Sequence, residues 1–359
     1  MKNNLIKKVG LSFVMAATII CSSNIFAQDK VAKDENKITL YPVEPVALPW
    51  GTDGTAGEYA YYALFGYLPQ TIKADDVEID TNTLYVVNGW NSYKGSDGCY
   101  YVKSKARPWA SFKSDKKFSN GTAIESGVSY YFKIEPVKWR VLDFDFQEGA
   151  DLLLAEKVLV SSPYYADKEK QRLVGGKQTF QNNYEFSTIR AFLNGLNGTA
   201  YEVEDFTHKG FVDMVFVPAA REFIKTTLVD NGPSTTTDYK GNITKAGKFV
   251  SKNTEDKVFL LSEEEVTNNN YGFDDYKVED PLSTRNRQVT DYAKAMGASA
   301  KADRNYANNG CWWLRTPSHS SEQNARCVLD VGNAFSTFYV NQSYGGVVPA
   351  LTVNYELIY

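Results

Sequence analysis

The sequence predicts an α+β fold, and three observations lead to that class. Runs of alternating or continuously apolar residues, which are typical of strands, fill both ends of the chain. Capped amphipathic segments, which are typical of helices, occur only in the middle, from about residue 187 to residue 297. No internal repeat of fixed period is visible. This order of strands, a few helices and strands again favours a mixed α+β domain.

The first half of the chain predicts strands almost throughout. They are expected over residues 59–70, 77–79, 83–87, 99–102, 129–134, 137–142 and 151–156. The strands expected within residues 77–104 look like paired strands, with a strong turn signal at residues 95–98. Residues 137–142 alternate, which predicts one wet face. Residues 151–156 form a continuous apolar run, which predicts a strand buried on both faces.

The second half predicts a few helices and then strands. The helices are expected over residues 187–196, from residue 263 onward, and over 287–296. Ser187 and Ser262 suit the N-cap position of the first two, and Gly297 suits the end of the third. Strands or buried runs are expected over residues 211–218, 257–261, 311–316, 325–331, 337–340 and 347–351, and a long exposed loop or hairpin over 230–254.

The N-terminus predicts export. In residues 1–27, three lysines precede an apolar run over residues 9–20 that is too short to span a bilayer. Cleavage after Ala27 would leave Gln28 first, and lipidation of Cys21 is the alternative. We expect residues 28–44 to be a flexible leader and residues 45–359 to be a single domain.

The net charge limits which partners the protein can bind, and the cysteine count limits which disulfides it can form. Loss of the signal peptide changes the formal net charge from −4 to −7, because it removes three lysines and no acid. That charge argues against nucleic acid and anionic lipid as partners. Cys99, Cys311 and Cys327 then remain, which permits one bridge at most. We expect Cys311 and Cys327 to pair, because they lie on strands expected to be neighbours; three unpaired buried thiols are the alternative.

Several runs occur in an order that resembles an uncharacterised domain family of exported bacterial proteins, seen in clostridia and treponemes. They lie at residues 65–71, 134–142, 152–156, 184–194, 258–262, 271–273, 312–317 and 346–351. The Trp-Trp-Leu-Arg-Ser/Thr-Pro run at residues 312–317 is the most specific of them. The resemblance covers about residues 60–359, and it implies that residues 72–128 are an inserted β-hairpin region between the first and the second of these runs. Val348 stands where the family has an arginine, so any role of that arginine is lost here.

That family is distantly similar to the C-type-lectin-like fold of the formylglycine-generating, sulfatase-modifying enzymes. The resemblance therefore implies a C-type-lectin-like mixed sheet, and it says little about chemistry. The modifying enzymes use a closely spaced reactive cysteine pair, whereas Cys311 and Cys327 are sixteen positions apart. We do not expect their oxidase activity in this chain.

No catalytic or metal-binding pattern stands out. His208 and His319 are the only histidines, and the sequence contains no Cys-x-x-Cys and no Gly-x-Ser-x-Gly. Carboxylates are plentiful but unspecific, and a calcium site at Asp274 and Asp275 with their acidic neighbours lacks an EF-hand spacing. We therefore expect no catalysis, no metal and no cofactor.

Binding is the better-supported function. Trp312, Trp313 and Arg315 could offer a stacking surface and a forked donor, and Asn333 and Tyr344 lie in loops that could complete the site. The alternative is that both tryptophans are core residues and the arginine pairs with a buried acid.

We expect an exported, non-catalytic recognition domain of the bacterial cell envelope, in the periplasm or on the surface. Its partner would be a glycan or a protein, with no nucleic acid and no membrane insertion. The alternatives are a hydrolase or oxidase on the same scaffold and a purely structural envelope protein.

Overall fold

A computed structural model describes residues 36–48, 60–111, 114–147, 149–166, 171–196, 206, 210–236, 242–275 and 279–357. Within these ranges, strands dominate and helices are short, so the predicted α+β class is confirmed. The helices are α1 (Thr188–Asn194), α2 (Phe211–Val215), α3 (Pro218–Arg221) and α4 (Asp291–Ala295). Single 3-10 turns are η2 (Pro233–Thr236), η3 (Lys245–Lys248), η4 (Glu265–Thr267), η5 (Asn269–Tyr271) and η6 (Arg304–Tyr306). The predicted signal peptide lies outside the described residues.

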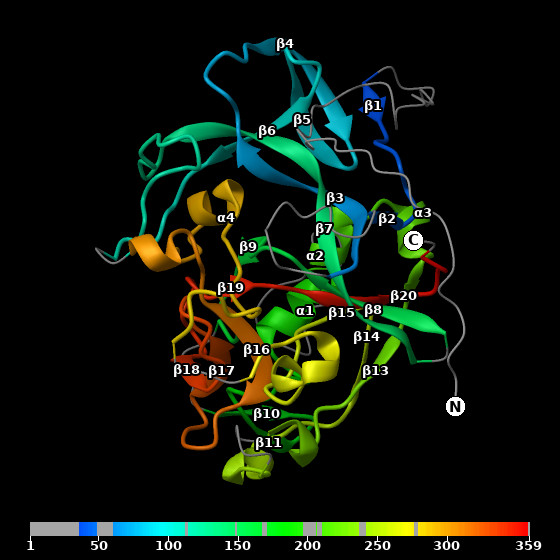
Figure 1. Cartoon of the computed structure of the whole chain (residues 1–359), viewed down its shortest axis with the longest axis vertical. Coiled ribbons are helices and arrows are strands. Elements are labelled where there is room, and N and C mark those ends of the chain that lie inside the picture. The colour runs from blue at the N-terminus through cyan, green and yellow to red at the C-terminus, as the bar shows by residue number, and fades with distance from the viewer. Residues whose placement is uncertain are drawn as a thin grey trace.

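One eleven-stranded sheet forms the body of the molecule (Figure 1). Its strands are β1 (Lys37–Ile38), β2 (Val46–Leu48), β3 (Tyr62–Ile72), β4 (Ile79–Val87), β5 (Trp90–Gly95), β6 (Tyr100–Lys105), β7 (Ser129–Gln147), β8 (Ala150–Ala155), β12 (Ile224–Lys225), β15 (Val258–Phe259) and β20 (Ala350–Val353). The hydrogen-bonded path runs β1-β4-β5-β6-β7-β8-β20-β12, and β2, β3 and β15 attach beside it. The β1–β4 pair is parallel, and the other described pairs in this sheet are antiparallel.

The region predicted as an insertion supplies β4, β5 and β6 to this sheet. The prediction divided β4 into two strands and missed β5 altogether. The connection between β4 and β5 is the tight turn Asn88-Gly89, where φ is 45° at Asn88 and 85° at Gly89. An Asn-Gly pair is a strong hairpin signal, so this turn was readable in the sequence.

The 19-residue strand β7 joins the insertion to the rest of the sheet. It pairs with β6 and β3 along its first part and with β8 along its second. The prediction of a wet face for residues 137–142 is wrong. Arg140 is only 4% exposed, because its guanidinium forms an ion pair with Glu156, 3.1 Å away, on the chain that follows β8.

A second sheet of five strands packs on the same hydrophobic core as the first. Its order is β18-β17-β16-β19-β9, with bounds Ser336–Tyr339, Asn324–Val328, Trp312–Pro317, Gly346–Val347 and Val160–Ser161. The predicted pairing of the strands after Cys311 and around Cys327 is therefore confirmed. Two hairpins stand apart from these sheets, β10 (Gln171–Val174) with β11 (Lys177–Phe180) and β13 (Thr227–Val229) with β14 (Thr254–Asp256).

Two of the predicted helices form, and both are shorter than expected. Ser187 caps α1 by accepting from the backbone N–H of Arg190, and Gly195 ends that helix with a φ of 62°. Helix α4 begins only after the N-cap Thr290, because residues 288 and 289 make bridges to other segments instead. Ser262 and Glu265 exchange the two bonds of a capping box, but only the 3-10 turn η4 follows.

Residues 211–218 were predicted to be a strand or a buried run; the run is largely buried, but residues 211–215 form helix α2 and not a strand. A short apolar run does not distinguish a buried strand from a buried helix by its periodicity, so tertiary packing decides. Helix α2 lies against β3 at Gly66, where φ is 72° and an added Cβ would come 2.6 Å from Val215 and Phe216. A glycine is therefore required at this contact.

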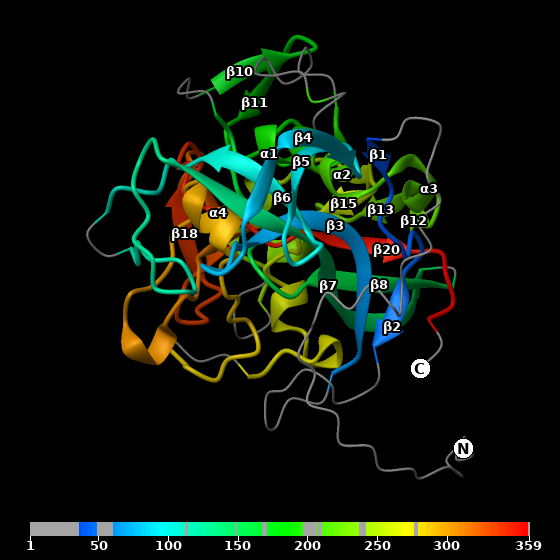
Figure 2. The ribbon, with the colours of Figure 1, turned by 90° about the horizontal axis from the view of Figure 1, so that it is seen from above.

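The chain before β3 is packed along the large sheet. Strand β1 pairs with β4 and β2 with β3, as Figure 2 shows from above. Two further bonds hold this segment: the N–H of Leu40 donates to Asn88 Oδ1 at 2.9 Å, and the Tyr67 hydroxyl donates to the carbonyl of Tyr41 at 2.6 Å. From residue 36 onward, the segment expected to be a flexible leader is instead held against β4 and β3.

Candidate functional site

Both tryptophans of the 312–317 run are core residues. Trp312 and Trp313 are each 0% exposed. The Trp312 indole N–H donates to the carbonyl of Arg285 at 3.2 Å, and that of Trp313 donates to the carbonyl of Ser162 at 2.8 Å. Because both rings are covered and both N–H groups are satisfied inside the protein, their predicted role as a ligand-stacking surface is wrong.

Arg315 is also committed to the interior. It is 2% exposed, and its Nε and Nη2 donate to the carbonyl of Asp230 at 3.0 and 2.9 Å. Its Nη1 and Nη2 also donate to the carboxylate of Glu265 at 2.5 and 2.7 Å. Nη1 donates as well to the carbonyl of Leu260 at 2.8 Å. The forked donor predicted for a ligand therefore holds three segments of this chain together.

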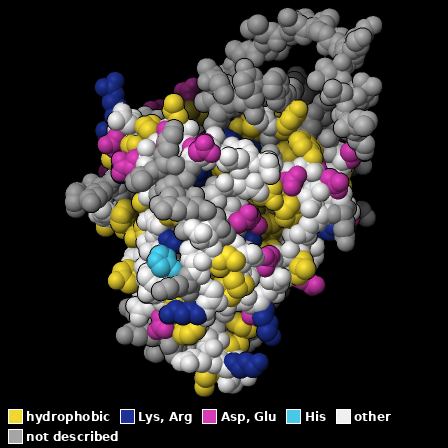
Figure 3. All heavy atoms as spheres, turned by 60° about the horizontal axis from the view of Figure 1, so that its bottom comes forward, with side chains coloured by type: hydrophobic (Ala, Val, Ile, Leu, Met, Phe, Trp, Pro, Cys, Tyr) yellow, Lys and Arg dark blue, Asp and Glu magenta, His cyan; other side chains and the backbone are white. Residues whose placement is uncertain are grey.

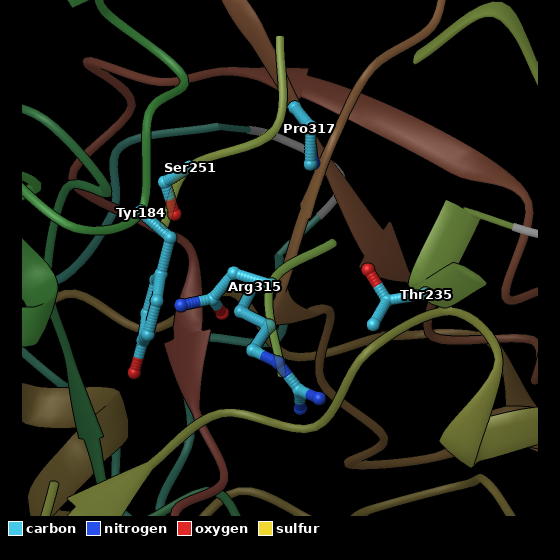
Figure 4. Close-up of a pocket in the computed structure, with 6 residues that line it drawn as sticks. Tyr184, Thr235, Ser251, Arg315 and Pro317 are labelled. Atoms are coloured by element: carbon cyan, nitrogen blue, oxygen red, sulfur yellow. The ribbon is translucent and has the colours of Figure 1, made fainter. Parts of the chain in front are cut away.

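A crevice beside Arg315 does not change that conclusion. Figure 4 shows the guanidinium between Tyr184 on one side and Thr235 on the other, with Ser251 and Pro317 above. About 180 Å³ of empty space, part of it open to solvent, lies along the crevice, but a water molecule does not fit there. We regard it as a packing gap around the buried ion pair and not as a ligand site.

The predicted Cys311–Cys327 disulfide is wrong. Both cysteines are buried free thiols. In the register of β16 and β17, Trp313 lies opposite Cys327, so Cys311 is a diagonal neighbour two positions away. Diagonal pairs sit about 7–8 Å apart, beyond the reach of a relaxed bridge. Burial raises the pKa of the Cys311 thiol to about 12.

The last two predicted residues occupy different environments. Asn333 is half-buried and shapes the turn after β17: its Oδ1 accepts from the N–H of Phe335 and its carbonyl accepts from the N–H of Leu329. Tyr344 is half-buried just before β19, and its ring stacks on that of Trp109 with centroids 4.2 Å apart and planes 27° apart. Trp109 was not predicted, and it comes from the inserted region.

Tyr344 and Trp109 end a row of aromatic rings that begins in the core. Trp313 meets Phe338 edge to face at a centroid distance of 5.7 Å, and Phe338 meets Tyr344 in the same way at 5.4 Å. Trp313 is fully buried, whereas the other three rings of the row are partly exposed. The row therefore connects the buried tryptophan of the 312–317 run to a surface where the insertion meets the second sheet.

A family model matches residues 148–355, which is more than half of the chain. The chain belongs to the domain of unknown function family DUF6273. Searches of curated proteins and of solved structures gave no match. The DUF6273 region contains β8 to β20 and the four α-helices of the described residues, while β1 to β7 precede it.

The Trp109–Tyr344 contact thus crosses the boundary of the DUF6273 region. Residues 106–111 and 114–117 are held on that region by several bonds. The N–H of Arg107 donates to the carbonyl of Ala295 at 2.7 Å. The buried Lys294 reaches from α4 to Asp115 Oδ2 at 3.0 Å and to the carbonyl of Lys117 at 2.7 Å. Helix α4 therefore positions the segment that carries Trp109.

Three of the acidic and histidine side chains of this DUF6273 chain, Glu263, Asp274 and His319, have partners within the protein. Glu263 pairs with Arg326 at 3.0 Å, and Arg326 Nη2 lies 3.1 Å from His319 Nδ1. Asp274 pairs with Arg285 at 2.6 Å. In the part of the chain that the structure describes, no three histidine, cysteine, aspartate or glutamate side chains form a possible metal site. His208 lies outside that part.

Two observations concern the surface and the membrane. On the face shown in Figure 3, acidic and basic side chains are interspersed among apolar and neutral ones. Across the described ranges, no helix is both long enough and apolar enough to cross a bilayer.

Proposed function

We propose that this chain is an exported, non-catalytic recognition domain of a bacterial cell envelope, and that it binds a glycan or a protein. The observation that carries the proposal is the partly exposed Trp109–Tyr344 ring pair, supported from below by Phe338. Aromatic side chains that are rigidly supported and partly exposed are typical anchors of binding surfaces.

Sequence features support the same proposal. The 312–317 run and its accompanying motifs resemble exported proteins of clostridia and treponemes, and residues 1–27 have the pattern of a signal peptide. A C-type-lectin-like scaffold, to which those proteins are distantly similar, would present its ligand surface on loops around a rigid core. We place the protein in the periplasm or on the cell surface.

Export and binding can be tested separately. Fractionation of cells that produce the full chain, followed by N-terminal sequencing of the exported product, should give Gln28 as the first residue. Retention in the cytoplasm with an intact N-terminus would contradict export, and an acylated Cys21 would show a lipoprotein instead.

Binding is tested with the purified exported protein on a glycan array and in pull-downs from cell-envelope extracts. We expect a saturable, specific partner in one of the two assays. The absence of binding in both, with the protein folded, would contradict a recognition function.

A further inference from the structure

We propose that Trp109 and Tyr344 form a ledge for a neutral saccharide, built jointly by the insertion and the DUF6273 region. This inference deepens the proposed function and rests on it. The aromatic ledge consists of the Trp109 and Tyr344 rings, and its polar rim consists of Asn341, Gln342 and Ser343 in the turn that leads to Tyr344.

The ring geometry suits an apolar ligand face. The two rings are nearly parallel, with centroids 4.2 Å apart, and Phe338 braces Tyr344 from the side of the core. Trp109 is partly exposed, so part of the ring surface that Tyr344 does not cover is accessible to a ligand. A braced aromatic loses little conformational entropy when a ligand stacks on it.

The rim suits hydroxyl groups. Asn341 and Ser343 are exposed and Gln342 is half-buried. Within the described ranges, the side chains of these three residues form no hydrogen bond. Two amides and a hydroxyl supply both donors and acceptors, and none of them carries a charge. Aromatic surface beside neutral hydrogen-bonding groups matches a sugar ring, which has apolar C–H faces and a hydroxyl edge.

Bonds from both sides fix the ledge in place. The carbonyl of Tyr344 accepts from the N–H of Ser299, and the N–H of Asp115 donates to the carbonyl of Ala300. Lys294 adds its contacts to Asp115 and to the carbonyl of Lys117. Residues 294–300 thus hold both halves of the ledge, which makes Lys294 a positioning residue.

The composite origin has a consequence for specificity. Tyr344 belongs to the region matched by the family model, whereas Trp109 lies before that region. The ledge of this chain therefore depends on its own inserted segment, and the DUF6273 region supplies only half of it.

The test compares four versions of the purified full-length exported protein on immobilised neutral oligosaccharides of glucose, galactose, mannose, xylose and N-acetylglucosamine. They are the wild type, Trp109→Ala, Tyr344→Ala and Tyr339→Ala. Tyr339 is the matched control, because it is a 57% exposed aromatic on β18 next to Phe338 and makes no ring contact with the ledge. Thermal unfolding of each variant checks that it is folded.

We expect the strongest wild-type binder to lose about tenfold or more in affinity with Trp109→Ala and with Tyr344→Ala, and to change less than about twofold with Tyr339→Ala. Saccharide binding that survives both ledge variants would overturn the inference and leave the recognition function intact. If no oligosaccharide binds but an envelope protein is captured specifically, the saccharide inference is overturned and the recognition function stands. Silence in every assay would overturn both proposals.

Discussion

Trp313 fits in the core because a glycine faces it. A Cβ added at Gly345 would lie 2.2 Å from Trp313 Nε1 and 2.4 Å from Cε2. The indole cannot retreat, since its N–H is bonded to Ser162 and its ring is packed between Tyr164 and Phe338. The tryptophan and the glycine therefore depend on each other, although they are far apart in the chain.

We predict that Gly345→Ala lowers the free energy of unfolding by about 1–3 kcal/mol, because the extra methyl group overpacks the core. Chemical denaturation monitored by tryptophan fluorescence measures this change. Gly247→Ala is the matched control, since a Cβ there meets only Pro233 at an ordinary 3.6 Å. Equal stability of the two variants would contradict this account of the Trp313 site.

Arg315 gives the second prediction at this scale. Replacing it with methionine leaves the Glu265 carboxylate, whose side chain is only 13% exposed, without its partner. We expect Arg315→Met to cost about 3 kcal/mol of stability in denaturant unfolding, as for other broken buried pairs. Arg315→Lys should also destabilise, because lysine cannot reproduce the fork. A folded, equally stable Arg315→Met protein that had lost ligand binding would restore the binding role that the structure argues against.

Among the elements, helix α4 has only five residues, but its side chains bond the inserted segment. Its Lys294 is 3% exposed and bonds the inserted segment, while its Asp291 accepts from the N–H and hydroxyl of Ser119 at 2.8 and 2.6 Å. The helix thus couples the insertion to the DUF6273 region through these polar side chains and also through apolar packing, since Tyr292 meets Trp90 of the insertion edge to face.

We predict that Lys294→Met loosens residues 106–119 without unfolding the sheets. Amide hydrogen exchange in that segment should speed up, because the bonds to Asp115 and Lys117 are lost. Lys105→Met, on the exposed side of β6, is the control and should leave exchange unchanged. If amide exchange in this segment is unchanged in both variants, the bonds from Lys294 are not needed to hold the segment.

Local sequence signals predicted some elements and missed others for physical reasons. The α1 cap at Ser187 and the strands around residues 312 and 325 follow from local chemistry, and the structure contains them. Helix α2 could not be predicted, because its apolar run takes its conformation from the packing against Gly66. The Trp109 part of the ledge could not be predicted either, since its contact with Tyr344 joins residues that only the folded topology brings together.

At the scale of the whole molecule, half-buried carboxyl groups make stability depend on pH in both directions. Burial opposes the charge of Asp274, but hydrogen bonds from Thr284 and Arg285 hold its pKa below the usual 3.8. Asp274 therefore stabilises the fold above about pH 4, and this contribution is lost as the pH falls through its folded pKa. Asp143 has the opposite effect on stability, because burial and then the charge of Asp145 raise its pKa.

We predict that Asp274→Asn is less stable than the wild type at pH 7 and that the difference shrinks toward pH 3. Asp143→Asn should be more stable than the wild type at pH 7, because it removes a charge that the fold disfavours, and this gain should vanish in acid. Denaturant unfolding at several pH values measures both curves. Parallel curves for the two variants would contradict the assigned pKa directions.

Strand β8 lies between β7 and β20, and all six of its residues are buried. The matched region of the family starts just after β7, so a shortened protein covering only residues 148–355 would lose that neighbour. One edge of β8 would then expose unpaired backbone groups beside three consecutive leucines, which is a template for aggregation. We expect such a fragment to elute from a sizing column as soluble aggregates, whereas a chain that begins ahead of β1 elutes as a discrete species. A protein stable enough to be produced and stored would therefore have to extend beyond residues 148–355, the region that the family model matches.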